Sequence, residues 1–455
     1  MSIQSKNPAT EKVLKSFKEI SNEELEKKLS LVSKAFQSWE KTTFKERAIL
    51  MYKLGEYLRN HAKDFSRLQM LEMGKTMKSG PIGIDKCALL CDYYADNAET
   101  ILADEILKTG KKEQYVKFDP LGVILGIMPW NFPFWQVYRY AVPAMMAGNV
   151  CLLKHASNVP QCAKAIEKSF RLAGFPKGIF QNLFLPASRV ENLIRDSRIV
   201  AISLTGSEKA GSEVARVAGE EIKKIVLELG GSDPFIVFAD ADILEAAKVA
   251  VVARLQGNAG QSCISAKRFI VEESIKEKFL KIVIEEFSKL SVGDPSDPAT
   301  DVGPLATEQI LLDVEKQVAQ SVKKGAKIVY GGSRKKGKGY FYLPTVLINV
   351  KKGMPVYDEE VFGPVLPVIT FRNEKEAIQI ANDTRYGLGA AIFTSDIAKA
   401  KRIIPQIKAG NVCVNDMVKS DPRAPFGGIK KSGYGRELSS YGIKEFVNIK
   451  NVWIA

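Results

Sequence analysis

A cysteine that follows a glycine-marked turn and an acid that precedes two glycines are the most informative residues of this chain. Cys263 ends the sequence Gly-Asn-Ala-Gly-Gln-Ser-Cys at 257–263, and Glu228 lies within Leu-Glu-Leu-Gly-Gly at 227–231. A cysteine attacks as its thiolate, so it needs a neighbouring base or a positive field. A carboxylate near the sulfur can act as that base. Neither segment is decisive alone, but together they make Cys263 a candidate nucleophile and Glu228 a candidate general base.

Short apolar runs alternate with helical patterns around these segments. Asn131, Lys154 and Gly206 each follow one of the expected strands directly. This alternation is typical of a parallel, doubly wound sheet, which binds ligands at the carboxyl ends of its strands. We therefore expect the three residues to meet at one edge of a sheet. The expected strands are 123–128, 150–153, 199–204 and 224–229, and the expected helices are 134–146, 161–173 and 208–218.

A second alternation begins near residue 233 and predicts another α/β domain. Residues 23–73 and 84–107 have helical periodicity. The segments 114–118 and 445–454 are typical of strands, and an apolar terminal strand without a partner favours pairing with another subunit. The expected elements of the second domain are strands at 235–238 and 268–271 and helices at 244–255 and 275–290.

The composition excludes several classes of protein. The net charge is +14, but no nucleic-acid-binding motif accompanies it. The charge could attract an anionic cofactor or substrate, but the interpretation that we favour is a lysine-rich proteome. The chain has no long uncharged apolar run and no secretory signal, which favours a cytoplasmic protein without membrane contact. The 6 cysteines are scattered and the 2 histidines are His61 and His155, so we expect neither a disulfide framework nor a metal site.

A further motif, Pro-Trp-Asn-Phe-Pro at 129–133, completes a pattern that resembles the aldehyde dehydrogenase superfamily from about Asn7 to Trp453. The resemblance implies that Cys263 attacks an aldehyde. The tetrahedral alkoxide that forms needs preorganised donors, and these would be the Asn131 amide and the backbone N–H of Cys263. Glu228 would then activate the water that hydrolyses the thioester.

The resemblance also implies a dinucleotide site. Gly206 and Ser207 lie in Leu-Thr-Gly-Ser at 204–207, where a tight turn leads to a helix N-terminus that faces the pyrophosphate. Lys154 and Ser157 are implied to hold the adenosine ribose. Where relatives restricted to NAD carry a glutamate, Ser157 removes the repulsion of a 2′-phosphate, so we expect NADP to be favoured over NAD.

The remaining cofactor residues come from two other motifs. Glu360 and Phe362 lie in Glu-Val-Phe-Gly-Pro at 360–364, which resembles the segment that holds the nicotinamide ribose and packs near the nicotinamide. Trp130, within the Pro-Trp-Asn-Phe-Pro motif, is also expected to bind the cofactor. The sequences at 426–428 and 431–437 resemble the C-terminal signature of the superfamily, which we interpret as shaping the substrate entrance and the subunit contact.

Within the superfamily, the chain is most similar to the short bacterial and archaeal succinate-semialdehyde dehydrogenases. Arg139 follows Asn131 by two helical turns, so we expect the two to share a helix face. An arginine there can clamp a distal carboxylate bidentately. The resemblance implies that Trp135 lines the pocket and that Ser420 assists. The alternative for Arg139 is an ordinary ion pair.

The resemblance implies an aldehyde dehydrogenase-like α/β fold of two doubly wound domains and a small β oligomerisation element. We assign residues 1–101 and 121–231 to the cofactor-binding domain and residues 232–430 to the catalytic domain. Residues 102–120 and 431–455 are expected to form oligomerisation strands, in a homodimer or homotetramer.

Three other functions compete with oxidation of succinate semialdehyde. The substrate could be another small aldehyde, such as glyceraldehyde, glyceraldehyde 3-phosphate, lactaldehyde or an aliphatic aldehyde. Coenzyme A could replace water as the acyl acceptor, although Glu228 would then have no task. The chain could also be a catalytically idle binding protein, which the presence of Asn131, Glu228, Cys263 and Glu360 together disfavours.

Overall fold

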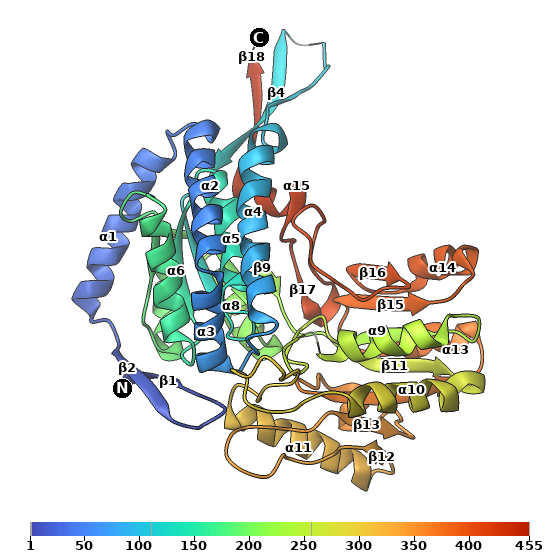
Figure 1. Ribbon diagram of the computed structural model, residues 1–455. Coiled ribbons are helices and arrows are strands. Elements are labelled where there is room, and N and C mark those ends of the chain that lie inside the picture. Colours follow the sequence, from blue (N-terminus) through green and yellow to red (C-terminus); the bar gives the residue numbers. More distant parts are fainter. Residues whose placement is uncertain (1, 111, 256, 455) are drawn as a thin grey trace.

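The computed structural model describes residues 2–110, 112–255 and 257–454 (Figure 1). The expected domain ranges also contain Met1, Lys111, Gln256 and Ala455, which lie outside the described residues. Two sheets, each covered by helices, form separate halves of the molecule, and a narrow projection carries the C-terminal strand. Each half has a hydrophobic core of its own.

The first half contains a six-stranded sheet in the order β17-β9-β8-β5-β6-β7. All neighbouring strands are parallel except β17, which pairs antiparallel with β9. The expected strands were therefore predicted correctly, with small differences at their ends. Their bounds are β5 (Val123–Met128), β6 (Val150–His155), β7 (Phe180–Asn182), β8 (Ile199–Thr205), β9 (Lys224–Glu228) and β17 (Gly433–Tyr434).

Helices cover both faces of this sheet because its central strands are apolar on both sides. The strand β6 has the sequence Val-Cys-Leu-Leu-Lys-His, and five of its six residues are buried. The helix α5 (Trp135–Met146) is buried along its whole length between the sheet and the outer helices. The other helices are α1 (Asn22–Trp39), α2 (Phe44–Asn60), α3 (Ala62–Met73), α4 (Gly80–Ile101), α6 (Pro160–Leu172), α7 (Val190–Arg195) and α8 (Glu208–Glu220).

The second half contains a seven-stranded sheet in the order β12-β13-β14-β11-β10-β15-β16, parallel except for β12. Its strands are β10 (Asp233–Val237), β11 (Ala266–Glu272), β12 (Lys327–Tyr330), β13 (Thr345–Ile348), β14 (Val365–Phe371), β15 (Gly389–Phe393) and β16 (Asn411–Val414). Its helices are α9 (Ile243–Leu255), α10 (Lys276–Ser288), α11 (Glu308–Lys323), α12 (Pro355–Asp358), α13 (Glu374–Asn382) and α14 (Ile397–Ile403).

A three-stranded antiparallel sheet joins the C-terminus to the middle of the chain. Its order is β18-β4-β3, with β18 (Val447–Ile454), β4 (Glu113–Pro120) and β3 (Glu105–Ile106). In Figure 1, β4 and β18 project together away from both halves. The range 431–455 is not made of oligomerisation strands throughout, because β17 joins the six-stranded sheet and α15 (Ser439–Ile443) is helical.

Two further elements differ from the sequence-based expectations. The helix expected at 84–107 ends at Ile101, because residues 105–106 pair with β4 instead. The N-terminal hairpin of β1 (Ser2–Lys6) and β2 (Val13–Lys18) was not expected. Within the described residues, no helix is both long and apolar enough to cross a membrane.

Candidate active site

Cys263 lies in the loop between α9 and β11, and contacts of a buried arginine with backbone carbonyl oxygens hold this loop in place. The guanidinium of buried Arg254 donates to the carbonyl oxygen of Ala266 at 2.8 Å and also contacts that of Gly363. Gly260 has a φ of 76°, and a Cβ atom there would lie 2.3 Å from the oxygen of Gly363. A glycine is therefore required at position 260 by both the backbone angle and this close approach.

A buried lysine joins the cysteine loop to the two other segments singled out in the sequence. Lys267 Nζ donates to the carbonyl oxygens of Cys263 at 2.7 Å and Ser262 at 2.8 Å. It also forms an ion pair of 3.2 Å with Glu360, whose carboxylate accepts from the backbone N–H of Gly231 at 3.1 Å. Segments that are far apart in sequence are thus fastened around the thiol.

Asn131 is positioned by hydrogen bonds to both sides of its loop. The side chain of Asn258 donates to the carbonyl oxygen of Asn131 at 2.8 Å, and Asn131 Nδ2 donates to the carbonyl oxygen of Gln261 at 3.2 Å. Burial lowers the pKa of His155 to about 4, so its imidazole is neutral and Nε2 donates to the carbonyl oxygen of Pro133 at 2.9 Å. His155 is therefore structural, and the Asn131 amide keeps a second N–H for another acceptor.

Two cavities meet at Cys263. The first has a volume of about 280 Å³ and lies over the ends of β5, β8 and β9. The second has a volume of about 340 Å³ and lies between α4, α5 and the segment near residue 420. Cys263 lines both of them, and Asn131 lines the first. A molecule in either cavity would therefore meet the sulfur.

The first cavity contains most of the predicted cofactor residues. The rings of Trp130 and Phe362 lie edge to face with centroids 5.8 Å apart. Ser207 is the N-cap of α8 and accepts from the backbone N–H of Ala210 at 3.3 Å. The N-terminus of α8 thus starts at the cavity wall, where its positive end favours an anion. The predicted residues that line the cavity are Trp130, Gly206, Ser207, Glu360 and Phe362.

Lys154 and Ser157 lie one strand farther along the sheet edge and line neither cavity. Lys154 is in β6 beside the end of β5, and Ser157 is exposed just after this strand. Lys154 is half-buried, burial lowers its pKa, and it forms no ion pair with any residue the structure describes. A half-buried cation without an acid fits a site for an anion.

The second cavity contains the three predicted substrate residues, Trp135, Arg139 and Ser420. The Arg139 guanidinium is already engaged: it forms a buried ion pair with Glu437 and lies 4.6 Å from the ring centre of Phe426. The expectation that Asn131 and Arg139 share a helix face was wrong, because α5 begins only at Trp135. The role of Arg139 toward a substrate carboxylate stays a prediction.

Glu228 lies at the end of β9 and is buried, with a side chain that lines neither cavity. Neither carboxyl oxygen has a hydrogen-bond partner among the described residues. Burial raises the pKa of Glu228 well above its usual value, and the nearby carboxyl of Glu437 raises it further. The Glu228 carboxyl group therefore resists ionisation at this position, and it must lose its proton before it can act as a base.

The thiol of Cys263 is also held in its neutral form. Burial raises its pKa to about 12, against the positive charges of Arg139 and Lys267, which lower it. A cysteine attacks as its thiolate, so the predicted role of Cys263 requires a base or a change of surroundings that lowers this pKa.

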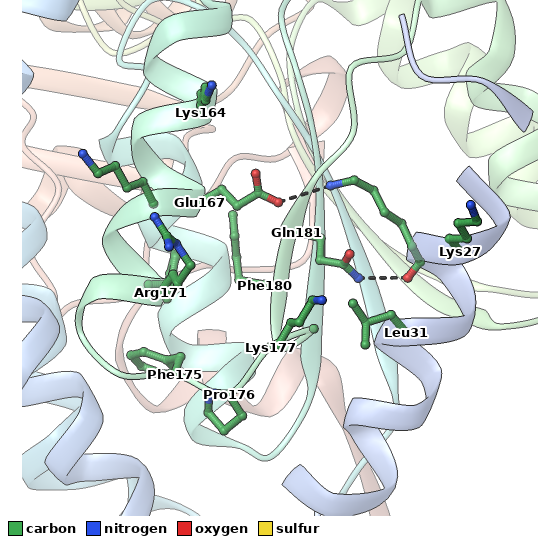
Figure 2. Close-up of a pocket in the computed structure, with 14 residues that line it drawn as sticks. Lys27, Leu31, Lys164, Glu167, Arg171, Phe175, Pro176, Lys177, Phe180 and Gln181 are labelled. Carbon is green, nitrogen blue, oxygen red and sulfur yellow. Dashed lines mark hydrogen bonds and ion pairs between the residues drawn. The ribbon is translucent and has the colours of Figure 1, made fainter. Parts of the chain in front are cut away.

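A cavity of about 550 Å³ lies elsewhere, between α1, α6 and β7 (Figure 2). Lys28 bridges it, with an ion pair of 3.3 Å to Glu167 and a carbonyl oxygen that accepts from Gln181 at 2.9 Å. Its other charged side chains are mainly exposed lysines, and its lining includes no cysteine and no histidine. Size alone therefore does not identify the reactive site.

Several residues that build the site were not predicted from the sequence. Arg254 and Lys267 are buried cations on either side of Cys263, but α9 and β11 each contain other charged residues, so the sequence does not distinguish these two. Lys86 and Glu437 gave no signal either, because their contacts come from distant parts of the chain. No group of metal-ligating side chains was found among the described residues.

Comparison with known proteins identifies the family of this chain. The sequence matches the aldehyde dehydrogenase family over residues 1–452. It is 50% identical to a probable succinate-semialdehyde dehydrogenase [NADP(+)] from Synechocystis, with 100% of both chains covered. It is 49% identical to a succinate-semialdehyde dehydrogenase [NADP(+)] from Mycobacterium avium, with 100% of this chain and 97% of that protein covered.

A solved structure gives the same result. The succinic semialdehyde dehydrogenase from Streptococcus pyogenes, in complex with NADP+, superposes with a TM-score of 0.97 at 38% identity, and 99% of each chain is covered. The expected fold is thereby confirmed, together with the resemblance that predicted it. The chain belongs to the aldehyde dehydrogenase family.

Proposed function

We propose that this protein oxidises succinate semialdehyde to succinate, with NADP+ as the hydride acceptor. The observation that carries the proposal is the position of Cys263 at the junction of two cavities, one at a sheet edge and the other lined by cations. The similarity to enzymes named for this substrate and cofactor supports it.

In the proposed reaction, the Cys263 thiol releases its proton to solvent, and the Sγ thiolate attacks the aldehyde carbon to form a thiohemiacetal oxyanion. The Asn131 amide and the backbone N–H of Cys263 stabilise the oxyanion. NADP+ bound in the first cavity would supply the hydride acceptor, and loss of hydride from this carbon would leave a thioester on Cys263. Glu228 then takes a proton from a water molecule that attacks the thioester, which releases the acid and restores the thiol. Because Glu228 lines neither cavity, its side chain must turn toward Cys263 for this step.

The residues around the first cavity fit NADP+. The N-terminus of α8 at Ser207 suits the pyrophosphate. Glu360 suits the nicotinamide ribose, and Phe362 and Trp130 suit the nicotinamide ring. Lys154 and exposed Ser157 suit a 2′-phosphate, since one supplies a charge without an acid partner and the other a hydroxyl group.

The proposal includes a cytoplasmic homodimer or homotetramer. The strand β18 lies at the edge of its sheet, and Ile449 and Trp453 on it are 61% and 63% exposed. An exposed edge of this kind suits pairing with a second copy of the chain.

A panel of kcat/KM values tests the proposal directly. Succinate semialdehyde, butanal, lactaldehyde, glyceraldehyde and glyceraldehyde 3-phosphate are assayed with NADP+ and with NAD+, and the product is identified as free acid or acyl-CoA. We expect succinate semialdehyde with NADP+ to give the highest value and free succinate to be the product. A higher value for another aldehyde, or a need for coenzyme A, would contradict it.

A further inference from the structure

Lys267 is a buried lysine whose ammonium group contacts two separate segments of the active site. Its side chain is 1% exposed. Nζ donates to the carbonyl oxygens of Ser262 at 2.8 Å, Cys263 at 2.7 Å and Ser265 at 3.3 Å, and it pairs with Glu360 at 3.2 Å. A buried ammonium group is costly unless hydrogen bonds and an opposite charge compensate for the loss of water. The partners that compensate for it here all belong to the active site.

One of these contacts fixes the peptide unit between Ser262 and Cys263. A trans peptide is planar, so its C=O and N–H groups point in opposite directions. Because Lys267 holds the carbonyl oxygen of Ser262, the N–H of Cys263 points away from the ammonium group. This N–H donates to no group in the described parts of the chain. It is the N–H that the proposed reaction needs as a donor to the oxyanion.

The charge of Lys267 also strengthens this donor. A hydrogen bond from a charged group is roughly twice as strong as one between neutral groups. Hydrogen bonds at the two ends of one peptide unit polarise each other, by about 10–30% per bond. The carbonyl oxygen of Ser262 accepts a second bond from the N–H of Ser265 at 3.3 Å, but that donor is neutral and farther away. Lys267 is therefore the main source of polarisation at this peptide.

The contact with Glu360 extends the arrangement to the cofactor-side cavity. Lys267 and the N–H of Gly231 both contact Oε1 of Glu360, at 3.2 Å and 3.1 Å. A Cβ atom at Gly231 would lie 2.7 Å from the carbonyl oxygen of Cys263, so only glycine lets these segments approach so closely. Glu360 lines the cofactor-side cavity. One ammonium group thus holds both the backbone of the cysteine and a carboxylate on the cofactor side.

We propose that Lys267 is a positioning residue of this enzyme. It orients and polarises the Ser262–Cys263 peptide so that the Cys263 N–H stabilises the oxyanion, and it anchors Glu360 beside the cofactor. Lys267 lines neither cavity, so it acts through the groups that it holds. This inference rests on the proposed function, since it concerns the oxyanion of that reaction.

Lys267→Met and the neighbouring Arg268→Met provide a matched test. Adjacent residues of a strand face opposite sides of the sheet, and buried Arg268 donates to three backbone carbonyl oxygens outside the cysteine loop. The first-turnover rate of NADPH formation from succinate semialdehyde is measured by rapid mixing at saturating NADP+. Lys267→Met should lower it roughly 10- to 100-fold, less than the about 10²- to 10³-fold for loss of a whole oxyanion donor. Arg268→Met should change it less than about threefold, because it removes no interaction made in the transition state.

Alkylation of Cys263 separates this role from a simple effect of charge on the thiol. Burial raises the pKa of Cys263, and the charges of Arg139 and Lys267 oppose this rise, so Lys267→Met should also slow alkylation. The rate with iodoacetamide is measured without aldehyde in a Cys413→Ala background, since the four remaining cysteines are buried. The first-turnover rate should fall at least about fivefold more than the alkylation rate, because alkylation forms no oxyanion.

A second variant keeps the outcome decisive. Lys267→Gln retains an N–H donor without the charge, so it should give an intermediate rate, and it replaces Lys267→Met if the methionine variant does not fold. An unchanged first-turnover rate, or a loss no greater than that of alkylation, would overturn the role of Lys267. If the natural protein forms no NADPH from succinate semialdehyde, the proposed function fails instead.

Discussion

The two cavities that meet at Cys263 differ in the way they are built. On the cofactor side, the wall consists largely of strand ends, the N-terminus of α8 and two aromatic rings. Its acid, Glu360, is already paired with Lys267. On the other side, the wall consists of helix side chains, among them Lys75 and Lys86, which have no acid partner in the described structure.

This difference separates common chemistry from specificity. Backbone groups at strand ends and at a helix N-terminus provide a dinucleotide site that changes little with the side chains around it. A charge on a helix side chain provides selection, because its removal alters one end of one substrate. Variants of residues that line the cofactor-side cavity should therefore change the kinetics with NADP+ and NAD+, and variants of the other cavity should change the preference between aldehydes. Variants of residues at the junction of the two cavities should affect every aldehyde alike.

The largest effect is expected for Cys263→Ala. Because the thiol belongs to both cavities, its loss should lower kcat at least about 10⁴-fold for every aldehyde, as for other enzymes that lose their nucleophile. NADPH fluorescence titration should still detect cofactor binding. Cys413→Ala is the control, since that half-buried thiol donates to the carbonyl oxygen of Asp416 at 3.0 Å and should be dispensable. Substantial turnover in Cys263→Ala would refute the shared-thiol arrangement.

The next largest effect is expected for Glu228→Gln. Removal of a general base lowers a rate about 10²- to 10⁴-fold, and here only the hydrolysis step should be affected. Rapid-mixing experiments should therefore show one equivalent of NADPH formed quickly, followed by slow turnover. Absence of this burst, with both phases equally slow, would place Glu228 in the first half of the reaction.

A smaller, selective effect is expected for Ser157→Glu on the cofactor side. The new carboxylate should repel a 2′-phosphate and accept from ribose hydroxyl groups, so the ratio of kcat/KM for NADP+ to that for NAD+ should fall roughly 10- to 100-fold. Ser157→Ala serves as the control without charge. An unchanged ratio would mean that Ser157 does not contact the cofactor. A changed preference between aldehydes would contradict the separation of cofactor binding and aldehyde selection between the two cavities.

The smallest effect concerns stability. Burial raises the pKa of Glu228 in the folded state, so the folded protein binds more protons than the unfolded protein above the usual carboxyl pKa, and stability falls as pH rises. Glu228→Gln lacks this loss. Its stability advantage should be absent near pH 4 and grow by up to about 1.4 kcal/mol per pH unit until the folded pKa is reached. Urea unfolding at several pH values measures the difference, and parallel curves for the two proteins would contradict it.

Much of the fold could be predicted because its strands are short apolar runs bounded by polar turns. The run at 123–128 became β5, and the run at 150–153 became the start of β6. The hairpin β1–β2 was missed because three of six residues in 13–18 are polar or charged, and five are exposed. The end of α4 was missed because residues 105–106 pair with β4, a preference that helical periodicity does not contain.

For the candidate site, the sequence indicated several residues but not the contacts between distant parts of the chain. Cys263 could be singled out because a reactive thiol follows a glycine-marked turn, whereas Asn131, Gly206 and Glu360 were assigned through the resemblance of their motifs to the superfamily. The state of Arg139 could not be predicted, since its partner Glu437 is far away in the sequence. The same holds for Lys86, whose contact with Ser420 joins α4 to a loop beyond β16.

The sequence by itself thus determined the alternation of strands and helices and the turn that carries Cys263, the proposed nucleophile, because these depend on neighbours within a few residues. Only the tertiary structure decided which charges are neutralised and which are left for a ligand. The physical reason is that burial and ion pairing depend on every segment packed around a group. The free energy of a charge is therefore set by the whole fold and not by its place in the chain.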